Sequence, residues 1–180
     1  DMGRDAFFGL LRESGLLVRQ QRRHARTTFS YHRFRKYPDM VKDMVIERAG
    51  QLWVSDITYI RTGQGFAYLS LVTDAYSRKV IGFSLSHALS TDNCLQALQM
   101  VLKQRAGNQP LVHHSDRGIQ YCSGAYTRLL KQQGIGISMT QSGNPRDNAI
   151  AERVNGILKM ELLQERYADI ISARRSIRQA

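Results

Sequence analysis

Residues 52–61 read LWVSDITYIR, a run of the β-branched and aromatic residues that favour strands. One acid, Asp56, stands in the middle of this run, between Val54 and Ile57. Burying a carboxylate there costs several kcal/mol (a rough figure) unless it is paired or binds a metal ion. The alternative is an ordinary aspartate on an exposed face or an edge strand. The run by itself predicts a strand and leaves both roles of Asp56 open.

Turn and periodicity signals on both sides of this strand predict an α/β domain. Short turns lead to strands over 66–73 and 79–86, which favours an antiparallel meander of three strands. The rest of the chain predicts a helix capped by Thr91 and Asp92 that ends near Arg105, a strand over 111–115, a helix over 123–133, a strand over 135–140, a helix over 149–165 and another from Ser172. This order predicts a ribonuclease-H-like fold, with a five-stranded mixed sheet and helices on both faces.

Composition points to a single basic domain with a polyanionic partner. The chain has 180 residues, a net charge of +11 and a pI of about 10.1, which favours a nucleic-acid partner over a membrane surface. Two cysteines, Cys94 and Cys122, form no disulfide framework and no zinc spacing, so they are expected as small buried apolar residues in a reduced, cytoplasmic protein. Neither a secretory signal nor a membrane-spanning run is apparent.

The first 48 residues differ in character from the rest. A helix is expected over 6–17, with Gly15 as a possible stop, and a basic arm without acids follows over 19–36. The arm is interpreted as a phosphate-contacting segment, because its like charges repel unless an anion screens them; a solvated tail is the alternative. The expected DNA contacts of this arm are Arg22, Arg23, Arg26, Arg33, Arg35 and Lys36. Residues 49–180 then form the core.

Two further carboxylates lie at positions suited to a site. Asp116, within HHSDRGIQY at residues 113–121, ends the fourth strand, at the kind of strand end where sites collect in α/β sheets. Glu152 lies early in the predicted helix over 149–165, away from its apolar stripe. Taken singly, Asp116 fits a turn and Glu152 fits ordinary helix-dipole chemistry. Together with Asp56, they suit Mg²⁺ or Mn²⁺, and two such ions would clamp a phosphoryl displacement.

The three acids stand in a D…D…E pattern with 59 residues between Asp56 and Asp116 and 35 between Asp116 and Glu152. The pattern lies within WVSDITYI, HHSDRGIQY and SGNPRDNAIAERVNGILKMEL, and strongly resembles the retroviral-integrase-like DDE transposases of bacterial insertion sequences. The likeness runs from the basic arm, RHARTTFSYHRFRKYPD, to the end of the chain.

The resemblance implies a set of roles. Asp56, Asp116 and Glu152 would be the catalytic, metal-binding triad, and Lys159, on the same helix face as Glu152 and Asn155, would contact DNA together with Asn155. The activity implied is cleavage at the 3′ end of a mobile element, followed by attack of the freed hydroxyl on a second phosphodiester, with no covalent protein–DNA intermediate. It also implies a bacterial, nucleoid-associated protein and a homo-oligomer on DNA.

Several other polar residues are weighed against structural roles. His113 and His114 are possible ligands or DNA contacts, although neighbours in a strand point to opposite faces. Asn144, Asp147 and Asn148 are expected to shape and cap the helix start, with Asp147 a weaker candidate for the site. Asp74 is expected to be structural, Trp53 a core residue, and Tyr121 a packing residue.

Two other functions use parts of the same evidence. A ribonuclease-H-like nuclease would carry similar carboxylates and hydrolyse without joining, so joined product separates it from a transposase. A non-catalytic DNA-binding fragment would bind with steep salt dependence and gain nothing from acids that repel phosphate. Family members usually carry a YNxxRPHxxL-like stretch and an end-recognising helix-turn-helix that this sequence lacks, so a truncated chain is expected.

Overall fold

A computed structural model describes residues 3–15, 32–105, 107–141, 148–159, 163 and 166–179. Its sheet has five strands in the order β3-β2-β1-β4-β5. The strands are β1 (Leu52–Thr62), β2 (Gly65–Asp74), β3 (Val80–Ser86), β4 (Val112–Ser115) and β5 (Gly136–Met139). The first three pair antiparallel, and β4 and β5 run parallel to β1, which confirms the predicted meander and mixed sheet.

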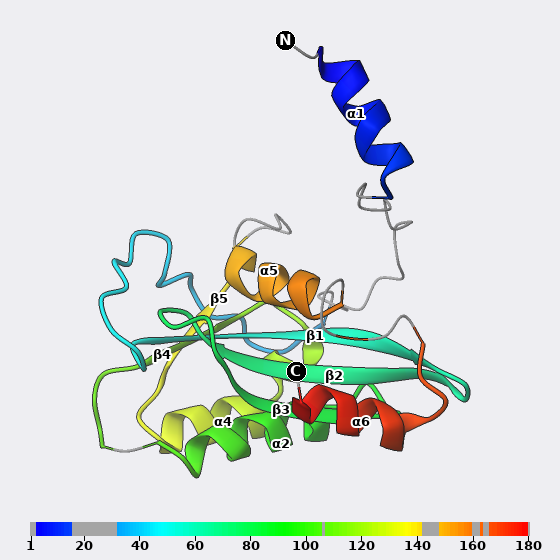
Figure 1. Cartoon of the computed structure of the whole chain (residues 1–180). Helices are drawn as coiled ribbons and strands as arrows, with labels where there is room; N and C mark the ends of the chain where they lie inside the picture. The colour runs from blue at the N-terminus through cyan, green and yellow to red at the C-terminus, as the bar shows by residue number, and fades with distance from the viewer. Residues whose placement is uncertain are drawn as a thin grey trace.

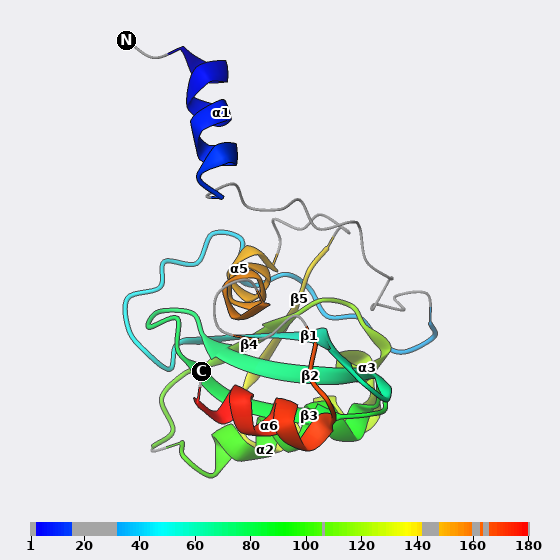
Figure 2. The same cartoon turned by 45° about the vertical axis from the view of Figure 1, so that its right-hand side comes forward.

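Helices cover both faces of the sheet (Figure 1). The helices α2 (Thr91–Leu102) and α4 (Gly124–Gln132) lie below it in Figure 1, with the short α3 (Ile119–Cys122) packed against both, whereas α5 (Ala149–Ile157) lies above it. A further helix, α6 (Ile170–Gln179), packs against β1 and β3, and the side chain of Arg174 donates a hydrogen bond to the Leu85 carbonyl of the edge strand. Figure 2 shows α5 end-on above the strands.

Alternation along β1 explains the two layers. Trp53 and Ile57 are buried in the core against α2, α3 and α4, as predicted for Trp53. Val54 and Ile60 belong to the apolar groups on the other face, with Ala151 and Leu158 respectively. Side chains of a strand alternate between faces, so Asp56 lies on the face that α5 covers.

Helix limits differ from the sequence prediction where capping side chains decide them. The N-cap of α2 is Ser90, whose hydroxyl accepts from the Asn93 amide, so the prediction of Thr91 and Asp92 as caps was wrong. The helix ends at Leu102, earlier than the expected Arg105. Helix α6 starts before the expected Ser172, because the Asp169 carboxylate accepts the Ser172 amide at 2.7 Å.

Two other helices also depart from expectation. The short helix α3 was not predicted at all, and α5 ends at Ile157, well before the expected residue 165. Leu158 and Lys159 continue the chain in a wider turn, in which the Leu163 amide donates to the Leu158 carbonyl at 2.8 Å. The stop after α4 is as predicted, since Gly134 has a φ of 64°, which a glycine adopts without strain.

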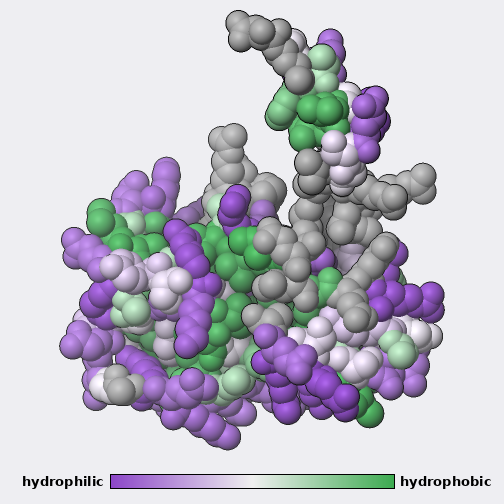
Figure 3. All heavy atoms as spheres, viewed as in Figure 1, coloured by the Kyte–Doolittle hydropathy of each residue, from purple (hydrophilic) through white to green (hydrophobic). Residues whose placement is uncertain are grey.

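The N-terminal segment forms α1 (Arg4–Glu13), none of whose residues is buried. It ends at Glu13, before the expected residue 17, and Gly15, the possible stop, follows two residues later with a φ of 67°. Figure 3 shows apolar side chains gathered on α1, where Phe7, Phe8 and Leu10 are exposed. No described helix is long and apolar enough to cross a membrane.

The described end of the basic arm lies along β5. The Met139 amide donates to the Pro38 carbonyl at 3.2 Å, and the Met40 amide donates to the Ser138 hydroxyl at 2.8 Å. Arg22, Arg23 and Arg26 lie outside the described residues, as do Asn144 and Asp147.

Candidate functional site: a carboxylate cluster between β1, β4 and α5

Asp56 is held by a backbone amide and by an amide side chain from α5. One carboxylate oxygen accepts from the Ile57 amide at 2.8 Å, and the other accepts from the Asn155 side chain at 2.5 Å. Asn155 was predicted to contact DNA, but it is buried and its amide nitrogen points to Asp56. In the structure, Asn155 thus orients the Asp56 carboxylate and ties α5 to β1.

Asp116 lies beside Asp56 because β1 and β4 are parallel neighbours. Their last registered pair is Val54 with His114, and each aspartate follows two residues later, Asp56 within β1 and Asp116 directly after the end of β4. One oxygen of Asp116 accepts from the Gly118 amide at 2.9 Å. A Cβ at position 118 would lie 2.9 Å from that same oxygen, so a larger residue there would push the Asp116 carboxylate away from its present position.

The electrostatics of Asp56 link the three acids. Burial, followed by the negative charge of Asp116, and to a smaller degree that of Glu152, raises the pKa of Asp56 to about 7. The hydrogen bonds from Ile57 and Asn155 act in the opposite direction and do not cancel this rise. With a pKa of about 7, Asp56 is partly protonated at neutral pH, because among the described residues no positive charge close to it offsets burial and the neighbouring acids.

Glu152 occupies the first turn of α5 and is exposed. Partial desolvation raises the pKa of its carboxyl. The start of α5 is fixed by Asn148, which was expected to cap it: Asn148 has the N-cap position, but its side chain donates to the Ser55 carbonyl on β1 at 3.1 Å and makes no capping bond. Asn148 and Asn155 thus attach α5 to β1 on both sides of Glu152.

Lys159 brings a positive charge to the same area. Its ammonium lies 4.0 Å from the centre of the Tyr59 ring, within cation–π range. Burial lowers the pKa of Lys159, and the nearby negative charge of Asp56 partly restores it. Lys159 was predicted on the face of Glu152 and Asn155, and its influence on Asp56 agrees with that placement. Nothing in the sequence beyond the strand pattern of residues 52–61 predicted that the Tyr59 ring would lie against Lys159.

Carboxylate oxygens are the kind of group that binds a hard divalent cation, but these carboxylates do not form a complete metal-binding arrangement. Within the described ranges, no three or more His, Cys, Asp or Glu side chains are close enough to hold a metal ion. The raised pKa of Asp56 is the feature that a divalent cation would reverse.

The other polar residues weighed from sequence have structural surroundings. His113 is buried between the Ser55 hydroxyl at 2.8 Å and the Tyr126 hydroxyl at 3.0 Å, and burial lowers its pKa to about 3. His114 contacts the Ser138 hydroxyl at 2.9 Å on the opposite face, as strand alternation requires. Tyr121, Cys94 and Cys122 are buried in the core as expected.

The described end of the basic arm contacts the loop that holds Asp116. The His32 ring bonds the Arg117 carbonyl at 2.9 Å, which joins the arm to the residue after Asp116. The cations of Arg35 and Lys131 lie 5.2 and 5.5 Å from the centre of the Tyr37 ring. Arg33, Arg35 and Lys36, all predicted DNA contacts, are exposed.

Comparison with known proteins finds two matching models of one family. An integrase core domain model matches residues 46–145, and a second integrase core domain model matches residues 133–180. The chain is 38% identical over 141 residues to the transposase for insertion sequence element IS629 of Shigella sonnei, covering 78% of this chain and 47% of that protein. It is 35% identical over 154 residues to transposase InsF for insertion sequence IS3A of Escherichia coli K12, covering 85% and 54%.

Solved structures agree on the fold. The integrase of a simian T-cell lymphotropic virus intasome, in complex with the PP2A regulatory subunit B56 gamma, matches with a TM-score of 0.59 and 20% identity over 76% of this chain and 47% of the other. The HTLV-2 integrase catalytic core domain in complex with magnesium, in its trimeric form, matches with a TM-score of 0.54 and 18% identity over 71% and 82%. These likenesses confirm the ribonuclease-H-like fold.

The chain spans about half the length of the curated relatives that it matches. The first family model nevertheless covers more than half of the chain, and it includes both Asp56 and Asp116. The chain therefore belongs to the integrase core domain family, among the integrase-like transposases of bacterial insertion sequences.

Proposed function

We propose that this chain is the catalytic core of a transposase that cuts DNA at the 3′ end of a mobile element and transfers that end to a second DNA site. Asp56, Asp116 and Glu152 are the catalytic carboxylates. The observation that carries the proposal is the raised pKa of Asp56, whose causes include the charges of both other acids. Perturbed carboxyl pairs are typical of sites that bind metal or move protons.

The residues fit a divalent cation such as Mg²⁺ or Mn²⁺. Asp56 and Asp116 would hold it with carboxylate oxygens, the ligands that these ions prefer, and Glu152 would complete the set from α5. When bound, one or two such ions supply Lewis-acid activation of the attacking oxygen and neutralisation of the leaving oxygen. Asn155 keeps the Asp56 carboxylate turned toward the site.

The chemistry needs no nucleophile from the protein. In cleavage, a water oxygen forms a bond to phosphorus, the bond from phosphorus to the 3′ oxygen breaks, the water loses a proton and the 3′ oxygen gains one. In transfer, the freed 3′-hydroxyl loses its proton and its oxygen replaces the leaving oxygen of the second strand, which gains a proton. The number of phosphodiester bonds is conserved in transfer, so no external energy source is required.

DNA is the partner that the charge pattern supports. The net charge of +11 and the exposed cations Arg33, Arg35 and Lys36 suit a phosphate backbone. Lys159 would contact a phosphate near the reacting one, because its ammonium lies over the Tyr59 ring and within electrostatic range of Asp56. Assembly on two DNA ends would require at least two copies of the protein.

Nicking of supercoiled plasmid in Mn²⁺ tests the proposal. The native chain is expected to nick, and Glu152→Gln at matched folding is expected to lose at least about a hundredfold in rate, or about 2.7 kcal/mol of transition-state stabilisation. Glu47→Gln is the matched control, because Glu47 is an exposed acid that precedes β1. Equal nicking by the native chain and Glu152→Gln would contradict the proposal.

Two further readouts separate the possible activities. Joined DNA products indicate transfer, whereas nicks alone indicate a hydrolytic nuclease. Calorimetric titration with Mn²⁺ gives a readout that does not depend on turnover: native protein should bind the ion, and Asp116→Asn should bind it at least about tenfold more weakly. Equal Mn²⁺ binding by both proteins would remove Asp116 from the proposed ligands.

A further inference from the structure

A hollow with two arginines lies at the turn of the β1–β2 hairpin, where β1 ends and β2 begins. It has a volume of about 460 Å³ and is lined by Arg61, Thr62, Gly65, Phe66 and Arg166. Both arginines are exposed, and half of the Phe66 surface is open to solvent. The exposed Phe66 ring therefore lies beside two cations that line the same hollow.

The two walls of the hollow are joined by the backbone. The Tyr167 amide donates to the Arg61 carbonyl at 2.9 Å, and the Gly63 amide donates to the Tyr167 and Ala168 carbonyls at 2.8 and 3.0 Å. A Cβ on Gly63 would lie 2.5 Å from the Ala168 carbonyl oxygen, so the contact depends on glycine. These bonds hold Arg166 beside Arg61 although 105 positions separate them in the sequence.

A row of rings and cations leads from the hollow to Lys159, which lies within electrostatic range of Asp56. Phe66 packs edge-on against Tyr59, with ring centres 5.3 Å apart. The Lys159 ammonium lies over the other ring of this pair, Tyr59, at 4.0 Å, and its pKa responds to both Asp56 and Arg61. Surfaces that follow a single nucleic-acid strand combine such aromatic platforms with cations that contact its phosphates.

We propose that this hollow is a subsite for single-stranded DNA, which takes a phosphate between Arg61 and Arg166 and stacks an unpaired base on Phe66. This proposal rests on the proposed function, which gives DNA as the substrate. It adds the place where a DNA strand would lie beyond the reacting phosphate. Rings favour unpaired bases, because a base within a duplex has no free face to stack. The subsite thus selects strand ends that have separated from their complement.

Binding of a fluorescein-labelled eight-residue oligothymidylate, measured by anisotropy in EDTA, tests the subsite apart from catalysis. Phe66→Leu is expected to weaken binding about fivefold or more, whereas Phe66→Tyr keeps the ring and should bind as native protein does. The double variant Arg61→Gln/Arg166→Gln should weaken binding and lower the slope of log affinity against log salt by up to about 1.4, since each single-strand phosphate contact contributes about 0.7.

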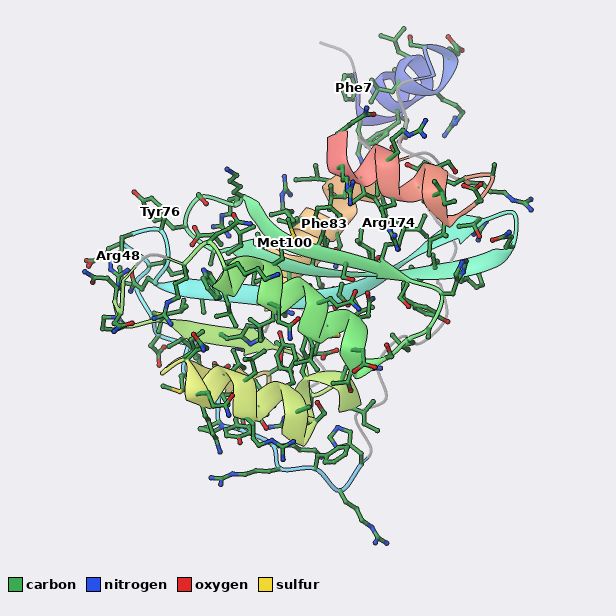
Figure 4. The ribbon with its side chains drawn as sticks, turned by 90° about the horizontal axis from the view of Figure 1, so that it is seen from below. Phe7, Arg48, Tyr76, Phe83, Met100 and Arg174 are labelled. Carbon is green, nitrogen blue, oxygen red and sulfur yellow. The ribbon has the colours of Figure 1, made fainter. Side chains whose placement is uncertain are left out.

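The control lies at the opposite end of β2. Tyr76 is exposed and follows Asp74, and Figure 4 shows it at the other end of the sheet from the β1–β2 turn. Tyr76→Leu removes an exposed ring and Lys79→Gln removes an exposed charge, both away from the hollow, and each should leave binding unchanged. Thermal unfolding of each variant establishes that it is folded.

Three results would overturn the subsite. One is native affinity in Phe66→Leu, and another is an equal loss in Tyr76→Leu. The third is equal competition by an unlabelled duplex of the same length, which would mean that the surface reads charge alone. Because the anisotropy assay is done in EDTA, without metal, these results would not bear on the nicking proposal. Conversely, if the anisotropy changes are as expected but no nicking is seen, the subsite proposal stands and the nicking proposal fails.

Discussion

Two aspartates on neighbouring strands have opposite surroundings. Asp74, at the end of β2, is buried, and its oxygens accept from the Gly50 amide at 2.6 Å and from the Ser77 amide and hydroxyl, each at 2.8 Å. Asp56, in the middle of β1, has two donors and faces two other acids, and its pKa is raised to about 7. Asp74 is surrounded by donors that stabilise its charge, as its predicted structural role requires.

The difference shows how a structural acid can be told from a candidate catalytic one. At Asp74 the loop folds around the carboxylate, so its charge contributes to the stability of the turn. At Asp56 the fold leaves negative charge uncompensated, which costs stability in the metal-free protein. Such a cost persists in a protein when function requires it, and a bound cation would remove it.

The largest expected effect is on chemistry at the cluster. Asp116→Asn should reduce Mn²⁺-dependent nicking by at least about a hundredfold, while DNA affinity stays the same or rises because one charge that repels phosphate is gone. Asp92→Asn, an exposed acid on α2, is the matched control and should nick as native protein does. A large loss of DNA affinity in Asp116→Asn would argue against a ligand role.

The second effect is on stability at Asp74. Asp74→Asn should lower the free energy of unfolding by about 2–3 kcal/mol, because an amide group must now face at least one of three donors. Urea unfolding at pH 7 measures this loss. If Asp74→Asn were as stable as native protein, the distinction between the two aspartates would fail on its structural side.

The third effect has the opposite sign. Because the folded pKa of Asp56 is raised, folded protein binds more protons than unfolded protein between about pH 4 and 7, so stability falls as pH rises through that window. Asp56→Asn avoids this loss and should be about 1–2 kcal/mol more stable than native protein at pH 8 without metal, with the difference shrinking toward pH 4. Urea unfolding at the two pH values measures it. A constant difference across the window would mean that Asp56 does not titrate there.

The smallest effect concerns Asn155. Its hydrogen bond lowers the Asp56 pKa, so Asn155→Ala should move the metal-free titration midpoint of Asp56 upward by about half a unit. NMR of the Asp56 carboxyl carbon follows this directly. As a control, Asn93→Ala removes a buried amide on the other face and should leave the midpoint in place, although it costs stability. A downward shift in Asn155→Ala would refute the positioning role.

The sequence by itself determined the order of strands and helices, because burial of one or both faces imposes a period that can be read along the chain. LWVSDITYIR predicts β1 correctly, and the three acids could be named from their places on elements. The starts of α2 and α6 could not be predicted well. Ser90 and Asp169 make the capping hydrogen bonds, but the neighbouring Thr91, Asp92 and Ser172 are also residue types that cap helices, so composition does not tell them apart.

Tertiary structure alone decided which polar groups meet. Asn155 has the sequence position of a surface residue on the helix, yet the packing of α5 on β1 turns it toward Asp56. Asp74 and Asp56 both lie in strands, and their surroundings differ because Gly50 and Ser77 donate hydrogen bonds to Asp74 alone. Arg61 and Arg166 line one hollow only because the segment at Tyr167 pairs with the end of β1. Such partners are distant in sequence, so their meeting depends on the free energy of packing the whole domain and leaves no local pattern.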